Sequence, residues 1–217
     1  MSIMADKILI DKLENEKELI QLGYKYIAGV DEVGRGPLCG PVVCCALIMP
    51  LDDIIDGIDD SKKISEKKRE KLYDIILSKA ISYKICSIDN NEIDEINILE
   101  ATKKCMIECL EGLNIKPDIA LTDALKLNTL IPHKPIIKGD LKSYTIGAAS
   151  IVAKVYRDRL MKEYAEIYPM YDLSSNKGYG TKKHIDAIKE YGPCPIHRKT
   201  FIKNFWVDQE NNEQKDI

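Results

Sequence analysis

The sequence lacks the features that mark secreted and membrane-spanning proteins. Its seven cysteines are an odd number and include no CxxC pair, which argues against a disulfide framework. No apolar run approaches the ~18 residues of a membrane span. The N-terminal segment is interrupted by Asp, Lys and Glu where a signal peptide would be apolar. We therefore expect a soluble, cytoplasmic protein with reduced thiols and no membrane partner.

Common cofactor motifs are also missing. The histidines, His133, His184 and His197, are scattered and do not combine with cysteines at the spacing of a four-ligand zinc site. Neither GxGxxG nor GxxxxGK[ST] is present, so no nucleotide-binding loop is indicated. Total charge is nearly balanced, with 32 basic and 35 acidic residues, and by itself suggests no nucleic-acid partner.

The sequence does contain enough apolar residues to build a globular core, since they make up 45% of its 217 residues. The continuous apolar run 41–49 indicates a strand buried on both faces. Small residues in the first half of the helix from 143 would allow close packing against a sheet. The pattern predicts helices over 7–22, 91–113, 143–168 and 181–191, the last of them the final helix, and strands over 26–30, 41–49, 82–88, 117–123 and 135–140. This order predicts an α/β domain with a mixed sheet and a helical C-terminal part.

Four carboxylates stand at the ends of apolar segments. Asp31 and Glu32 follow the first predicted strand, Asp123 closes PDIALTD, and Asp140 closes PIIKGD. Acids that converge at one sheet edge repel one another unless a cation compensates them, and Mg²⁺ or Mn²⁺ prefers such oxygen ligands. A pair of these ions is a known device for phosphodiester hydrolysis.

Another interpretation is that each acid is a turn residue or a helix N-cap, roles for which aspartate is favoured. The pair Asp31–Glu32 fits this interpretation less well because Gly-Arg-Gly follows it closely. Glycines at 34 and 36 allow close backbone approach, and Arg35 supplies a charged donor, which would suit a sugar-phosphate.

Several blocks together resemble bacterial ribonuclease HII, the type 2 ribonuclease H family. They are YIAGVDEVGRGPLCGPVV, DDSKKISEKKREKLY, IDEINILEATKKCM, IIKGDLKSYTIGAASIVAKVYRDRLM and NKGYGTKKHIDAIKEYGPCPIHRKTF, and they occur in the family's order. The departures are mild: Cys39, Cys44 and Cys45 stand where small apolar residues are usual, and Gly147 replaces a common alanine. The short N-terminal extension and Asp140 favour this family over ribonuclease HIII.

The resemblance implies an RNase H-like fold, a mixed β-sheet flanked by helices. Its domains would be an N-terminal helical extension (1–25), a catalytic domain (26–192) and a C-terminal extension and tail (193–217). Asp31, Glu32, Asp123 and Asp140 match the family's four catalytic, metal-binding acids. Gly34, Arg35 and Gly36 match the element that reads the 2′-hydroxyl, which alone distinguishes RNA from DNA at a given site. Tyr179 matches the tyrosine that packs on a deoxyribose at the RNA–DNA junction.

Local charge supports a nucleic-acid substrate. Residues 134–164 hold seven basic and three acidic side chains, and residues 176–203 hold seven and two. We interpret Lys62, Lys177 and Lys182 as phosphate contacts, although a solvated helix face would also explain such lysines.

These features predict a monomeric endoribonuclease that uses Mg²⁺ or Mn²⁺, with two ions in the site during catalysis. It would hydrolyse the RNA strand of RNA–DNA hybrids and cut 5′ to single ribonucleotides in duplex DNA, leaving 3′-hydroxyl and 5′-phosphate ends. Two alternatives remain open from sequence. One is a non-catalytic hybrid-binding module stabilised by metal. The other is a general metal-dependent DNA nuclease of the same superfamily, such as an integrase or resolvase type.

Overall fold

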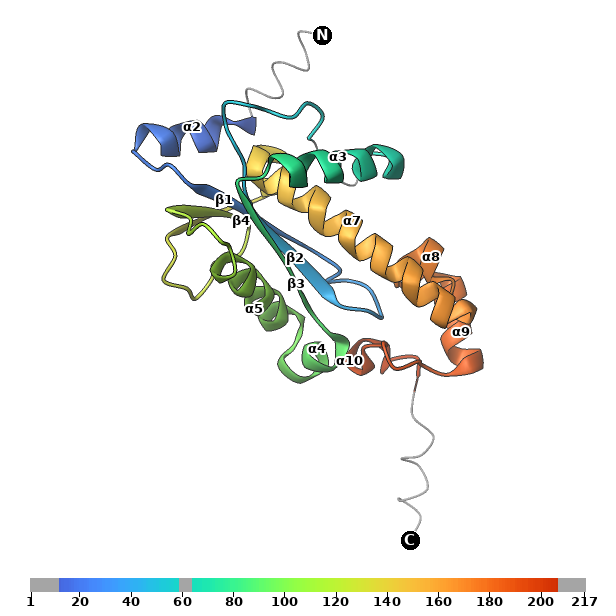
Figure 1. The fold of residues 1–217 in the computed structure, drawn as a ribbon. Coiled ribbons are helices and arrows are strands. Elements are labelled where there is room, and N and C mark those ends of the chain that lie inside the picture. The colour runs from blue at the N-terminus through green and yellow to red at the C-terminus, as the bar shows by residue number, and fades with distance from the viewer. Residues whose placement is uncertain (1–11, 59–63, 207–217) are drawn as a thin grey trace.

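A five-stranded mixed sheet forms the centre of the computed structural model, which describes residues 12–58 and 64–206 (Figure 1). The strand order is β3-β2-β1-β4-β5. β1 pairs antiparallel with β2 and parallel with β4; β2–β3 is antiparallel and β4–β5 parallel. The strands are β1 (Ile27–Val33), β2 (Val42–Ile48), β3 (Ser82–Ile88), β4 (Ile119–Asp123) and β5 (His133–Ile136). The predicted mixed α/β architecture is therefore confirmed.

Helices cover both faces of the sheet (Figure 1). α7 packs on β1 and β2 with α3 against it, and α5 packs on the opposite face. The helices are α2 (Glu14–Gln21), α3 (Glu66–Lys79), α4 (Asn90–Ile96), α5 (Ile98–Glu111), α6 (Gly139–Lys142), α7 (Tyr144–Ile167), α8 (Leu173–Asn176), α9 (Lys182–Tyr191), α10 (Lys199–Ile202) and the 3₁₀ turn η1 (Pro169–Tyr171). Among the helices of the described ranges, none combines the length and the apolar character needed to cross a bilayer.

The strand β2 shows why its sequence is apolar without alternation. All its residues are buried. Val43, Cys45 and Leu47 join the apolar cluster beneath α7, whereas Cys44 and Ala46 join the one beneath α5. A strand buried on both faces is therefore confirmed for this segment.

The close approach of α7 to β1 depends on Gly29. A Cβ atom at Gly29 would lie 2.2 Å from the carbonyl carbon of Thr145. Since no side chain fits there, the glycine lets the first turn of α7 rest directly on the strand that carries two of the predicted acids. The expectation of close packing by the first half of this helix is confirmed.

Several predicted boundaries are wrong. The single helix predicted over 91–113 is two helices, because Asn97 adopts φ +69° and its side chain caps α5 by accepting from the backbone N–H groups of Leu99 and Glu100. α9 begins and ends as predicted from Thr181, but α10 follows it. Of the helix predicted over 7–22, residues 7–11 lie outside the described ranges.

Two boundary errors concern the acids themselves. β1 continues to Val33, so Asp31 and Glu32 lie within the strand rather than after it. β5 ends at Ile136, and Asp140 lies in the four-residue helix α6 instead of closing a strand. The chain enters α6 through Lys138, whose left-handed backbone (φ +59°) turns it out of the extended conformation.

Candidate active site

Three of the four predicted acids meet at one point. The carboxylates of Asp31 and Glu32 on β1 and of Asp123 at the end of β4 place oxygen atoms within 4.8 Å of one another. The parallel pairing of β1 with β4 produces this meeting, because Val30 is opposite Thr122 and the next residue of each strand is an acid. Asp31 is only 5% exposed. Such a group of carboxylate oxygens can hold a hard divalent cation.

Asp140 lines the same cavity, of about 370 Å³, but does not belong to the group of three. Its helix α6 is joined to the group by a hydrogen bond in which the backbone N–H of Gly139 donates to Asp123 Oδ1 at 2.7 Å. The four predicted acids therefore share one cavity, with Asp140 at its side.

The pKa values of two carboxylates in this group are raised. Burial raises the pKa of Asp31 well above its ordinary value, and the negative charge of Glu32 raises it further. Burial also raises the pKa of Glu32, with Asp123 adding to the effect, whereas the cationic Arg35 at 3.3 Å lowers it. Desolvation and like-charge repulsion act together here, and both are relieved when a cation binds.

One atom provides a test of whether a cation fits. Within the described ranges, Glu32 Oε2 is buried and has no hydrogen-bond partner. A buried carboxylate oxygen without a donor is costly. A divalent ion between Glu32, Asp31 and Asp123 would supply the missing partner, so the donor set fits Mg²⁺ or Mn²⁺.

The Gly34-Arg35-Gly36 segment is held from below by two buried arginines. Arg198 donates to the carbonyl oxygens of Gly34 (2.6 Å), Arg35 (3.0 Å) and Gly40 (3.0 and 2.8 Å). Arg157 donates to the carbonyls of residues 39, 41 and 177. Both side chains are fully buried. Their guanidinium groups fix the course of the loop that follows β1.

Gly34 itself is required by this arrangement. Its φ is +93°, and a Cβ there would lie 2.3 Å from Nε of Arg157. Arg35 and Gly36 are exposed, whereas Gly34 at the base of the loop is buried. The close approach seen at Gly34 is that of Arg157, and the approach of a sugar-phosphate to this loop stays a prediction.

Tyr179 lies next to this loop. Its ring atom Cε1 is 3.6 Å from the position of a Cβ on Gly36, and the backbone N–H of Leu38 donates to the carbonyl of Gly178 at 2.8 Å. Tyr179 is 44% exposed and lines the cavity with the acids. The structure thus brings the two predicted recognition elements, which are far apart in sequence, side by side.

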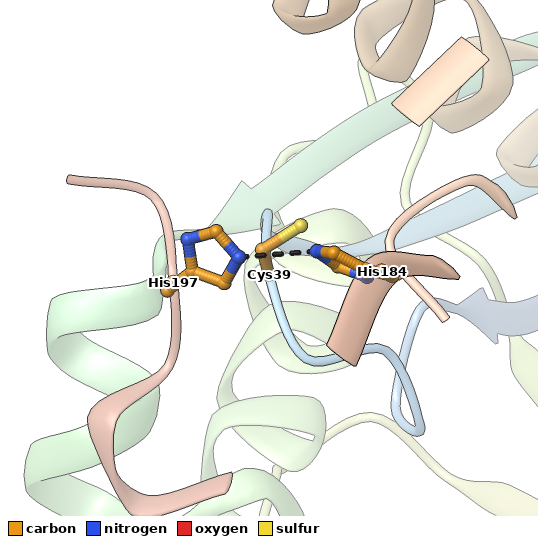
Figure 2. Close-up of side chains that lie close together, drawn as sticks. All are labelled: Cys39, His184 and His197. Atoms are coloured by element: carbon orange, nitrogen blue, oxygen red, sulfur yellow. Dashed lines mark hydrogen bonds between the residues drawn. The ribbon is translucent and has the colours of Figure 1, made fainter. Parts of the chain in front are cut away.

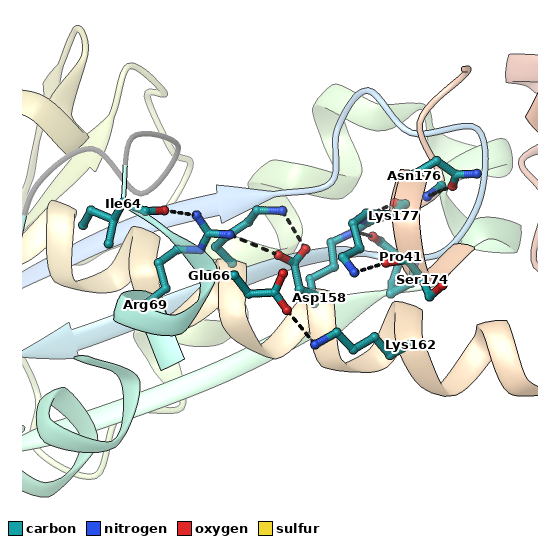
Figure 3. Close-up of polar contacts among 12 residues, drawn as sticks. Pro41, Ile64, Glu66, Arg69, Asp158, Lys162, Ser174, Asn176 and Lys177 are labelled. Carbon is teal, nitrogen blue, oxygen red and sulfur yellow. Dashed lines mark hydrogen bonds and ion pairs between the residues drawn. The ribbon is translucent and has the colours of Figure 1, made fainter. Parts of the chain in front are cut away.

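The described residues include two of the three lysines predicted to contact phosphate. Lys62 lies outside the described residues. Lys182 is exposed at the first residue of α9. Lys177 is half-buried, its ammonium donates to the carbonyl of Ser174, and burial lowers its pKa. Figure 3 shows Lys177 turned toward Ser174.

Three polar residues that line the cavity were not singled out from sequence as site residues. Ser150 and Lys154 line the cavity from α7, and Arg69 from α3. Lys154 pairs with Asp158 at 2.6 Å, and Arg69 reaches the same carboxylate at 3.8 Å (Figure 3). The signal that could have found two of them is their spacing: 150, 154 and 158 place polar residues on one face of the helix.

A second cluster, formed by Cys39, His184 and His197, lies buried behind the loops (Figure 2). His184 Nδ1 faces the carbonyl of Tyr179 at 3.0 Å, which only accepts, so its Nε2 is an acceptor. His197 Nδ1 accepts from the backbone N–H of Cys194 at 2.9 Å, so its Nε2 donates to His184 Nε2 at 3.1 Å. Two neutral imidazoles are thereby satisfied.

The charges around this cluster decide its role. Arg157 and Arg198 are buried beside Cys39 and both carry positive charge. A divalent ion would add to that buried positive charge, and burial raises the pKa of the Cys39 thiol to about 12, so a thiolate is not available to offset it. We assign the cluster to support of the Tyr179 segment rather than to metal binding.

The histidine pair should make stability depend on pH. Burial lowers the pKa of both residues, that of His197 to about 4. Between pH 6.5 and 4 the two histidines bind protons in the unfolded chain but stay neutral in the folded protein. The free energy of unfolding therefore falls as the pH falls through this window. His197→Gln, which keeps a donor toward His184, should flatten the slope measured by urea unfolding. An equal slope in the variant and the parent would contradict the expectation.

Comparison with known sequences places the site in a family context. A sequence model of the family described as Ribonuclease HII matches residues 28–207. Ribonuclease HII of Acetivibrio thermocellus is 56% identical over 193 residues, which are 88% of this chain and 75% of that protein. Ribonuclease HII of Caldicellulosiruptor saccharolyticus is 51% identical over 201 residues, covering 91% and 98%.

Solved structures agree with these sequence matches. The ribonuclease H2 of Pyrococcus horikoshii superposes with a TM-score of 0.70 at 28% identity, over 88% of this chain and all of that one. The RNase HII of Archaeoglobus fulgidus, solved in a complex with PCNA, gives a TM-score of 0.67 at 25% identity, over 86% and 99%.

Proposed function

This chain belongs to the ribonuclease HII family and is a type 2 ribonuclease H endonuclease acting on RNA–DNA hybrids; from that premise we propose that it also cuts 5′ to single ribonucleotides in duplex DNA. The products are 3′-hydroxyl and 5′-phosphate ends. The observation that supports this most is the meeting of Asp31, Glu32 and Asp123 beside the Gly34–Gly36 loop.

The acids bind the catalytic ions in this proposal. Asp31, Glu32, Asp123 and Asp140 hold two divalent ions, Mg²⁺ or Mn²⁺, which when bound supply an activated water and neutralise charge on the leaving oxygen. The chain's own contribution is positioning. Arg35, which faces Glu32, Lys154, which lines the cavity, and the exposed Lys182 orient the phosphate backbone.

Recognition of the ribose is assigned to the loop. Backbone groups of Gly34, Arg35 and Gly36 contact the 2′-hydroxyl, which can donate and accept at once. Arg198 holds these groups in place by engaging the carbonyls of the first two residues. Tyr179 packs on the neighbouring deoxyribose, so that the pair of loops reads the RNA–DNA junction.

A labelled DNA duplex with one ribonucleotide tests the proposal. Incubated with Mg²⁺ or Mn²⁺, it should be cut once, 5′ to the ribonucleotide, while the all-DNA duplex stays intact. Cutting of both duplexes would favour a general DNA nuclease. A hybrid-binding module would bind the ribonucleotide duplex and leave it uncut.

Tyr179 supports a separate prediction. Tyr179→Ala should lower kcat/KM on the single-ribonucleotide duplex about tenfold, the effect of losing ~1.4 kcal/mol of ring contact. A long hybrid should be affected less, because it offers no such junction. The melting temperature should not change, since the ring is 44% exposed. Tyr191→Ala, an exposed tyrosine on α9, is the matched control; equal losses on both substrates would refute junction reading.

A further inference from the structure

The N-terminal helix α2 and the residue Lys12 before it lie outside the residues matched by the family model, yet they contact the segment that carries Asp140. We propose that Lys12, Asn15 and Glu16 are positioning residues that set the place of Asp140 and hence the affinity of the site for its divalent ions. The proposal rests on the proposed function, in which Asp140 is a metal ligand.

The first contacts are to the backbone of α6. Lys12 Nζ donates to the carbonyl of Asp140 itself at 3.0 Å, and Asn15 Nδ2 donates to the carbonyl of Lys142 at 3.2 Å. Lys12 is 3% exposed, so its bond is shielded from water. Two carbonyls at the end of this short helix are therefore capped from a segment more than a hundred residues earlier.

Glu16 holds the junction between α6 and α7. It is fully buried, and its Oε1 accepts from Ser143 Oγ at 2.6 Å, from the Thr145 N–H at 3.0 Å and from Thr145 Oγ1 at 3.0 Å. Ser143 Oγ in turn accepts from the Ile146 N–H and so caps α7. The carboxylate thus faces the positive end of a 24-residue helix, where negative charge is favoured.

Asp140 needs such support because its own helix is weakly determined. α6 has four residues and is entered through a left-handed Lys138. On the side of the catalytic sheet, Gly139 N–H donates to Asp123 Oδ1. On the other side, α2 supplies the contacts just described. The position of the Asp140 carboxylate relative to the other three acids therefore depends on the hydrogen bonds that hold α6 from both sides.

Mn²⁺ affinity measured by isothermal titration calorimetry tests the proposal without using activity. Glu16→Ala should weaken Mn²⁺ binding about tenfold, within the 10–100-fold range found when groups that orient metal ligands are removed. Lys12→Met and Asn15→Ala should also weaken Mn²⁺ binding. These two variants test the proposal if Glu16→Ala does not fold. Glu14→Ala, which makes the same change at an exposed position of α2, is the matched control and should bind Mn²⁺ as the parent does.

A double-mutant cycle separates positioning from general stability. In an Asp140→Asn background, Glu16→Ala should produce no further loss of Mn²⁺ affinity, because the ligand it positions is gone. A fall in melting temperature with unchanged Mn²⁺ affinity in the Glu16, Lys12 and Asn15 variants would overturn the proposal, as would full additivity in the cycle. Failure of the parent protein to cut the ribonucleotide duplex would instead overturn the proposed function.

Discussion

Asp31→Asn should abolish cleavage of the single-ribonucleotide duplex while the protein stays folded. We expect kcat to fall by at least ~10³-fold. Removing a single hydrogen-bond donor to the transition state already lowers kcat by up to about that factor. Asp31 is the most enclosed of the three converging acids, and an amide in its place removes the charge that holds the cation and leaves a weaker, neutral oxygen as the ligand. Gel-based cleavage in saturating Mg²⁺ measures the loss.

The same substitution should make the metal-free protein more stable. The pKa of Asp31 is raised in the folded state, so above that pKa its ionised form costs folding free energy. Asparagine removes this cost, and the melting temperature in EDTA should rise, while the further rise that Mg²⁺ causes in the parent should be lost. Asp52→Asn, an exposed acid, is the control. A variant that still cleaves at the parent rate would remove Asp31 from the site.

Arg198→Lys should damage substrate recognition and stability together. Lysine cannot span the carbonyls of Gly34, Arg35 and Gly40, so at least one is left buried without a donor, at ~1–3 kcal/mol each. We expect the free energy of unfolding to fall by ~3 kcal/mol. We also expect kcat/KM on the ribonucleotide duplex to fall ~10²-fold, the size of effect that a 1 Å misplacement of binding groups can have.

The control for this prediction is Arg159→Lys, which changes an exposed arginine of α7 paired with Glu70. Cleavage is compared at a temperature where every variant is folded by circular dichroism. If Arg198→Lys loses stability but keeps the parent kcat/KM, then Arg198 supports the fold without positioning the loop that we propose contacts the ribose.

Local patterns in the sequence predicted the elements whose burial is uniform. The apolar run of β2 was sufficient because all its residues are buried. β3 covers the residues predicted for it, although its burial does not alternate along the strand. The periodicity of 91–113 was not sufficient, because apolar spacing continues across Asn97, while the break depends on that residue's positive φ and its side-chain cap.

The candidate site was predicted in its residue types but not in its geometry. The acids could be identified because carboxylates next to apolar segments are costly, whereas their meeting depends on a parallel pairing between distant strands. Two other contacts are tertiary: the hydrogen bond between His184 and His197, and the hydrogen bonds that Glu16 accepts from residues 143–145. No periodicity along the chain reports them, since each residue is ordinary within its own segment.

The parallel pairing of β1 with β4 has a consequence for biosynthesis. β1 is synthesised before its partner β4 and before the helix α7 that covers it. Asp31 and Glu32 therefore stay separate from Asp123 until β4 and α7 have been made. Before that point the growing chain cannot bring these three carboxylates together around a cation.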